Sequence, residues 1–182
     1  MSQPKFAKGQ NEMANFDGLS SGSGLTDVLK LFPRNSELLL RLLNDIMCAD
    51  GALSRGEREA IAAFISKQNT TPYCVFYHTV FSEVFAGPVE DTNKRIQPLL
   101  TYALGLHSKN SDKITEAFDA ALSAGWSEVA VYEVVEVCGI FDFINNIVLA
   151  SGINTPEGPM NPFPTVDGLK DSYAAMANAI CN

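Results

Sequence analysis

The chain has 182 residues, of which 46% are hydrophobic and 19% are charged, a composition typical of one globular domain rather than of a disordered chain. Its net charge is −8, and its 13 lysines and arginines form no run, which argues against nucleic acid or a membrane surface as a partner. The N-terminal residues lack the apolar core of a signal peptide, and no apolar run is long enough for a membrane span, so we expect a cytoplasmic protein.

Helical periodicity runs through most of the chain after a polar first segment. Residues 1–23 are rich in glycine and serine and predict a flexible arm. From residue 24 onward, apolar residues recur at spacings of three and four, and no stretch alternates as a half-buried strand would. We therefore predict one all-α domain over residues 24–182 with about seven to eight helices. They are expected over residues 25–32, 36–48, 54–68, 72–86, 93–107, 112–123, 127–150 and 167–180.

Two predicted segments, a long central helix and a C-terminal crossing, organise the other helices. The segment of about 127–150 is the longest and most apolar, so we expect a central helix that is buried on most sides. Four prolines make residues 153–164 a rigid extended crossing, and an amphipathic helix completes the C-terminal segment 153–180. Ser54, followed three residues later by Glu57, predicts a capping box at the start of the helix over 54–68.

The residues most suited to chemistry lie in the stretch 69–78. Cys74 and His78 are four residues apart, so a helix would place the thiol and the imidazole on one face. Pro72 predicts a helix start, where the dipole and the unpaired N–H groups would stabilise a Cys74 thiolate. Glu59 on the preceding helix could fix the imidazole tautomer or relay a proton. Such a set can attack a peroxide O–O bond, although a buried cysteine beside a satisfied histidine fits the same spacing.

These residues together resemble the signature of the carboxymuconolactone decarboxylase / alkylhydroperoxidase D-like superfamily, in its peroxidase-related branch. The similar motifs are Leu53-Ser-Arg-Gly-Glu-Arg-Glu59 and Asn69-x-x-x-Tyr-Cys74-x-x-x-His78, within a signature over 53–78. The similarity extends over roughly residues 25–153. It implies an alkylhydroperoxidase D-like helical bundle in which Cys74 becomes a sulfenic acid, with Glu59 and His78 as a proton relay. The family's resolving cysteine falls on Thr71, which cannot form a disulfide.

A sulfenic acid at Cys74 therefore needs a different thiol. The four cysteines form no CxxC pair, which favours reduced thiols over a disulfide framework. Cys48 ends the preceding helix and Cys138 lies on the long helix, so either could approach Cys74, although Cys138 fits the core more simply. A small external thiol reductant is the third candidate.

Other polar residues are assigned supporting roles. Tyr73 and Tyr77 flank Cys74, and Asn145 on the long helix could reach the same site. Glu133, Glu136 and Asp142 lack the Glu-x-x-His partners of a di-iron bundle, so we predict no metal and no other cofactor. His107 ends a predicted helix, where a positive charge is favourable.

Three functions fit the pattern. The first is an antioxidant oxidoreductase that reduces a hydroperoxide with one peroxidatic cysteine and an external thiol. The second is a carboxymuconolactone decarboxylase-type enzyme on a small acid or lactone, which needs cationic groups, and the nearby Arg55 and Arg58 are expected on solvated surface. The third is a catalytically degenerate family member with a binding role. The resemblance also implies a homo-oligomer, as a dimer, trimer or hexamer.

Overall fold

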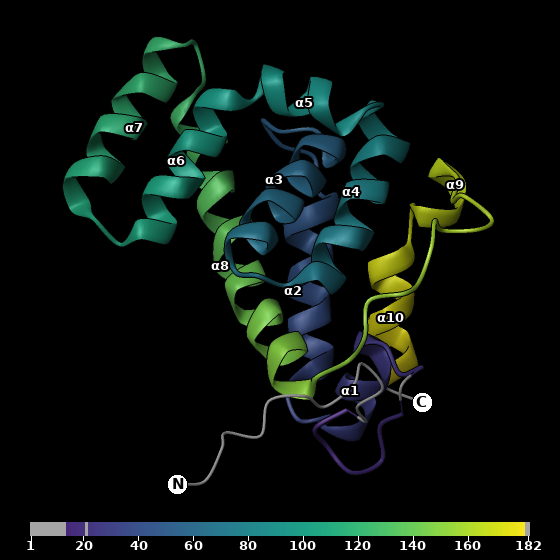
Figure 1. The fold of residues 1–182 in the computed structure, drawn as a ribbon. Helices are drawn as coiled ribbons and strands as arrows, with labels where there is room; N and C mark the ends of the chain where they lie inside the picture. Colours follow the sequence, from purple (N-terminus) through teal and green to yellow (C-terminus); the bar gives the residue numbers. More distant parts are fainter. Residues whose placement is uncertain (1–13, 21, 181–182) are drawn as a thin grey trace, which may run out of the picture.

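The computed structural model describes residues 14–20 and 22–180, and these residues form helices and connecting segments without a strand (Figure 1). The predicted all-α class is therefore confirmed. The helices are α1 (Leu25–Leu31), α2 (Ser36–Cys48), α3 (Arg55–Gln68), α4 (Pro72–Ala86), α5 (Val89–Arg95), α6 (Gln97–Ser108), α7 (Ser111–Ser123), α8 (Glu128–Ser151), α9 (Val166–Leu169) and α10 (Ser172–Ile180).

The described residues thus hold ten helices, two more than the eight expected, because two predicted segments are each divided. The segment 93–107 is broken at Ile96, where α5 ends and α6 begins. Pro98 lies in the first turn of α6, and it has no N–H for a hydrogen bond to the preceding helix. The segment 167–180 is divided into the single turn of α9 and the longer α10.

Helix α3 is enclosed by its neighbours, with ten of its 14 residues buried. Small side chains make this possible, because a Cβ added to Gly56 would overlap the Cβ of Ala86 on α4. The predicted capping box is present at its start. The Ser54 hydroxyl accepts a hydrogen bond from the Glu57 amide, and the Glu57 carboxylate accepts one from the Ser54 amide at 2.8 Å. The α3–α4 pair therefore places Glu59 against the helix that carries Cys74 and His78.

Helix α8 crosses the molecule beside α2, α3 and α6 and buries Phe141, Ile144 and Val148 among them (Figure 1). By length and composition it is also apolar enough to cross a membrane, contrary to the expectation from the sequence. Half of its most apolar 18-residue stretch is buried inside the fold, as in the core helix of a globular protein.

Both ends of the described chain pack against the bundle. The Asn15 amide donates to the Ser151 carbonyl at 2.7 Å, and the ring of Phe16 meets that of Phe32 edge to face, so residues 14–20 lie against the end of α8. The remainder of the predicted arm, residues 1–13, lies outside the described residues. After the proline-rich crossing, α10 packs against α2 and α1. This return brings C-terminal side chains to α3.

Candidate functional site

Glu59 of α3 and His78 of α4 meet in the interior. Glu59 is fully buried and His78 is 7% exposed, and the His78 Nδ1 atom lies 2.6 Å from Glu59 Oε2. Because a carboxylate accepts hydrogen bonds, Nδ1 is the donor in this contact, and in the neutral imidazole Nε2 is then the proton acceptor. The edge of the Phe141 ring packs against the imidazole at 4.5 Å between centroids. The spacing in the sequence thus identified two side chains that form a hydrogen-bonded pair.

Tyr173 of α10 completes the surroundings of this carboxylate. Its hydroxyl donates to Glu59 Oε1 at 3.0 Å and Oε2 at 3.2 Å, and it lies 3.5 Å from His78 Nδ1. Burial raises the pKa of Tyr173 well above its usual value, and the negative charge of Glu59 raises it further, so the phenol stays a donor. Sequence reasoning missed this residue. The available signal was a tyrosine on the predicted C-terminal amphipathic helix, 114 residues from Glu59.

Arg55 also belongs to the site, contrary to its expected place on solvated surface. Its Nε atom lies 3.5 Å from Glu59 Oε1, and its side chain is 13% exposed. The guanidinium lies over the Phe85 ring at 4.3 Å, and its terminal nitrogens donate to the Lys170 carbonyl and the Ser172 hydroxyl. Arg55 therefore holds the start of α10 against α3, which keeps Tyr173 in place.

Arg58, the other arginine expected on the surface, is buried as well. It donates to Glu133 Oε2 on α8 at 2.9 Å, and the two side chains are 4% and 11% exposed. The same carboxylate accepts hydrogen bonds from the amides of Ala52 and Leu53. Burial opposes ionisation of Glu133, but the hydrogen bonds from these amides and from Arg58 outweigh it and lower its pKa. Glu133 is thus a structural anchor for the turn that precedes α3.

Cys74 lies in the first turn of α4, as predicted, but its thiol is not activated in this structure. The residue is 2% exposed, and burial raises its pKa to about 12. No hydrogen bond to its sulfur is present among the described residues. Burial therefore opposes the thiolate that the helix N-terminus was expected to stabilise.

The neighbours of Cys74 have structural roles. Thr71 is fully buried and precedes α4, and its amide donates to the Ser66 carbonyl at 2.9 Å. The Tyr73 hydroxyl accepts a hydrogen bond from the Leu25 amide at 3.0 Å and so connects α4 to α1. The Tyr77 ring lies 4.9 Å from that of Tyr73. These contacts direct Tyr73 toward α1 rather than toward the Glu59–His78 pair.

The cysteines considered as resolving partners lie in different environments. Cys48, Cys74 and Cys138 are free thiols. Burial raises the pKa of Cys48, and the charges of Arg55 and Glu59 act on it, which places it on the side of the buried pair. Burial raises the pKa of Cys138 to about 12, and the charges that act on it belong to Asp142 and Lys109. Cys181 lies outside the described residues.

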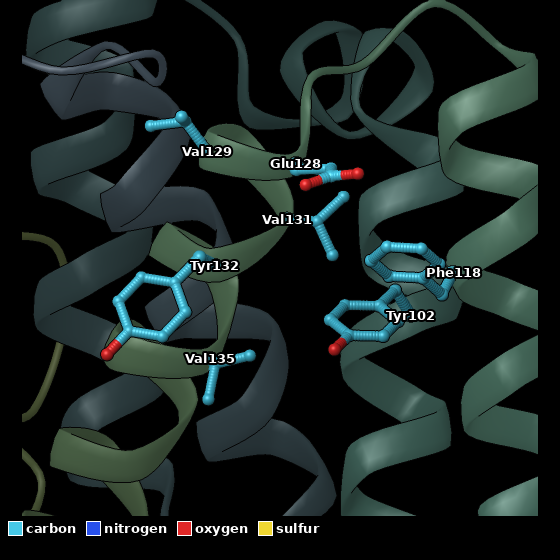
Figure 2. Close-up of a pocket in the computed structure, with 7 residues that line it drawn as sticks. All are labelled: Tyr102, Phe118, Glu128, Val129, Val131, Tyr132 and Val135. Carbon is cyan, nitrogen blue, oxygen red and sulfur yellow. The ribbon is translucent and has the colours of Figure 1, made fainter.

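Two pockets are described, and neither is lined by Glu59, Cys74 or His78. One is an apolar groove of about 420 Å³ between α6, α7 and α8 (Figure 2). It is lined by Tyr102, Phe118, Glu128, Val129, Val131, Tyr132 and Val135. The other, of about 280 Å³, has a polar lining that includes Asn145 and His107. The described residues hold no group of three or more His, Cys, Asp and Glu side chains that could bind a metal.

The helical bundle has the alkylhydroperoxidase D-like fold that the signature predicted. Among solved structures, the chain is similar to an alkylhydroperoxidase AhpD core, an uncharacterized peroxidase-related protein from Ralstonia eutropha JMP134. The TM-score is 0.61 at 20% sequence identity, and the match covers 71% of this chain and 74% of that one. No protein-family model and no curated protein matches the sequence. The likeness therefore lies in the fold.

Proposed function

We propose that this protein is a thiol-dependent peroxidase that uses Cys74 as its only peroxidatic cysteine and Glu59 with His78 as a proton relay. The observation that carries the proposal is the buried 2.6 Å contact between Glu59 and His78, one helical turn from Cys74 on α4. A peroxidase-related protein of the same fold supports the reaction class. The Asn69-to-His78 motif supports the choice of residues.

The reaction needs only side chains of this protein and two substrates, a hydroperoxide and an external thiol. The Cys74 sulfur attacks one oxygen of a hydroperoxide, so that an S–O bond forms and the O–O bond breaks. His78 Nε2 accepts the thiol proton and passes it to the leaving alkoxide, which departs as an alcohol. Two external thiols then reduce the sulfenic acid to the thiol, giving a disulfide and water. This cycle suits a reducing compartment such as the cytoplasm.

The burial of the Cys74 thiol favours slow turnover. With a pKa of about 12, only about one Cys74 in 10⁵ is a thiolate at pH 7, and this small reactive fraction limits the rate of attack. The decarboxylase alternative has less support. Its substrate would need a free cation, but Arg55 is engaged by the carbonyl of Lys170 and Arg58 is paired with Glu133.

The test is to treat the protein with tert-butyl hydroperoxide and a sulfenic-acid probe, and to locate the label by mass spectrometry. We expect label on Cys74, its loss in Cys74→Ser, and its retention in the matched controls Cys48→Ser and Cys138→Ser. Hydroperoxide consumption with dithiothreitol should follow the same order. Consumption by Cys74→Ser at the wild-type rate would show that the reaction does not use this thiol.

The pH profile of the same labelling reaction tests the buried thiol. The pKa of Cys74 is raised, so the thiolate fraction increases about tenfold per pH unit throughout the range below about 12. The labelling rate should therefore rise continuously from pH 7 to about pH 10. A plateau near pH 7 would mean that the reactive state holds a preformed thiolate.

We also propose a homo-oligomer that uses the exposed face of α8. Val129, Tyr132 and Phe143 are each more than half exposed, and Val129 and Tyr132 border the groove in Figure 2. Large apolar side chains exposed along one helix are typical of an interaction surface. Sedimentation should show an assembly that Tyr132→Glu dissociates into smaller species. A wild-type protein that sediments as a monomer would rule the assembly out.

A further inference from the structure

The second pocket lies where the end of α3, the end of α6 and the second half of α8 come together. Its volume is about 280 Å³. Its lining comprises Asn69, His107, Lys109, Asp142, Asn145, Asn146 and Leu149. None of these residues takes part in the proposed peroxidase reaction. The pocket is therefore a separate feature with its own chemistry.

Asn145 carries a buried donor without a partner in this lining. The residue is 1% exposed, and its Oδ1 atom accepts a hydrogen bond from the Ser66 hydroxyl at 3.1 Å. Its Nδ2 atom is buried and has no hydrogen-bond partner. Buried polar groups in native proteins are nearly always paired, so an unpaired amide beside a pocket indicates a missing acceptor.

The charged groups of the pocket also favour an acceptor. Its one carboxylate, Asp142, is already engaged, since Oδ1 accepts from Asn69 Nδ2 at 2.8 Å and Oδ2 lies 3.6 Å from Lys109 Nζ. His107 lies in the last turn of α6 and lines the pocket. The donors that face a ligand are thus the Asn145 amide, the His107 ring and the Lys109 ammonium, which has two N–H groups besides the one directed to Asp142.

We infer that this pocket binds a small carboxylate. One carboxylate oxygen accepts the hydrogen bond from Asn145 Nδ2, and the other faces His107 and Lys109. The aliphatic side chain of Leu149 lines the wall and contacts a short carbon skeleton. An ionised carboxylate offers acceptors and no donor, which matches the donors that the lining leaves free. The inference does not depend on the peroxidase reaction.

The two histidines of the chain give a direct test, because His107 lies in this pocket and His78 in the buried pair. Protein labelled with ¹⁵N at histidine is titrated with propionate, with propionamide, and with sodium chloride at matched ionic strength. We expect propionate to shift the His107 signals in a saturable way while those of His78 stay in place. Propionamide, which lacks the charge, should bind at least tenfold more weakly.

Two variants identify the contacts. Asn145→Asp keeps the size of the side chain but replaces the donor with a carboxylate, and it should lower propionate affinity at least tenfold. Lys109→Gln changes a side chain that is 75% exposed, so it leaves the fold intact and should lower affinity severalfold. Unchanged His78 signals show that each variant is folded.

The inference is overturned if wild-type His107 does not respond to propionate, if propionamide binds equally well, or if Lys109→Gln leaves the affinity unchanged. If Asn145→Asp fails to fold, the Lys109→Gln titration decides. In the case of no response, the Asn145 amide is satisfied by an ordered water and the pocket holds no ligand of this class.

Discussion

Replacing Glu59 with glutamine is expected to slow the peroxide-dependent oxidation of Cys74 by about 10²-fold or more, the usual contribution of a positioned acid–base group. Glutamine keeps the shape of the side chain and can still accept a hydrogen bond from Tyr173. It carries no charge, however, so it cannot stabilise the imidazolium that forms when His78 accepts the thiol proton. The measurement is the initial rate of sulfenic-acid labelling at Cys74 under a fixed hydroperoxide concentration.

Tyr173→Phe is the matched control for this prediction. It removes the hydrogen bonds of 3.0 and 3.2 Å to Glu59 but leaves the carboxylate beside His78, so it should cause a smaller loss of rate. The unfolding midpoint of each variant must be recorded, because Glu59 also lies 3.5 Å from Arg55. If folded Glu59→Gln reacts at the wild-type rate, the 2.6 Å contact is structural and the relay is wrong.

The parts that the sequence predicted well are those in which the signal is local. Apolar residues at spacings of three and four mark α2 and α3, and Ser54 with Glu57 marks the start of α3. Glu59 and His78 were predicted from a motif that spans only two helices. The 2.6 Å contact between their side chains follows from α3 and α4 being neighbours in both sequence and space.

The parts that were missed depend on packing between distant segments. Tyr173 reaches Glu59 only because residues 153–165 return α10 to α3. Arg58 has the charge pattern of a surface residue, and its burial depends on Glu133 lying 75 residues later on α8. The ionisation of Cys74 depends on the balance between burial and the helix dipole, and the degree of burial cannot be deduced from its position in the first turn.

Replacing Arg58 with methionine is expected to destabilise the protein by about 3–5 kcal/mol, because it leaves the Glu133 carboxylate buried and without its counter-ion. The pair also holds the turn before α3, since Glu133 accepts from the Ala52 and Leu53 amides. Urea unfolding followed by circular dichroism measures the loss. The matched control is Lys94→Met, whose ion pair with Asp91 is exposed, and its effect should stay within about 1 kcal/mol.

The double variant Arg58→Met/Glu133→Leu separates charge from hydrogen bonding. It removes the uncompensated charge, so it should recover part of the loss, but the Ala52 and Leu53 amides remain without an acceptor and recovery should be incomplete.

The pH dependence of stability gives a second test of the Arg58–Glu133 pair. The pKa of Glu133 is lowered from 4.5 on folding, so the stabilisation from the Arg58 pair is complete above about pH 4.5 and is lost as the pH falls below it. The difference in stability between wild type and Arg58→Met should therefore shrink in acid. A difference that persists there would mean that the guanidinium stabilises the fold by packing and by its hydrogen bond to the Ala49 carbonyl rather than by its charge pair with Glu133.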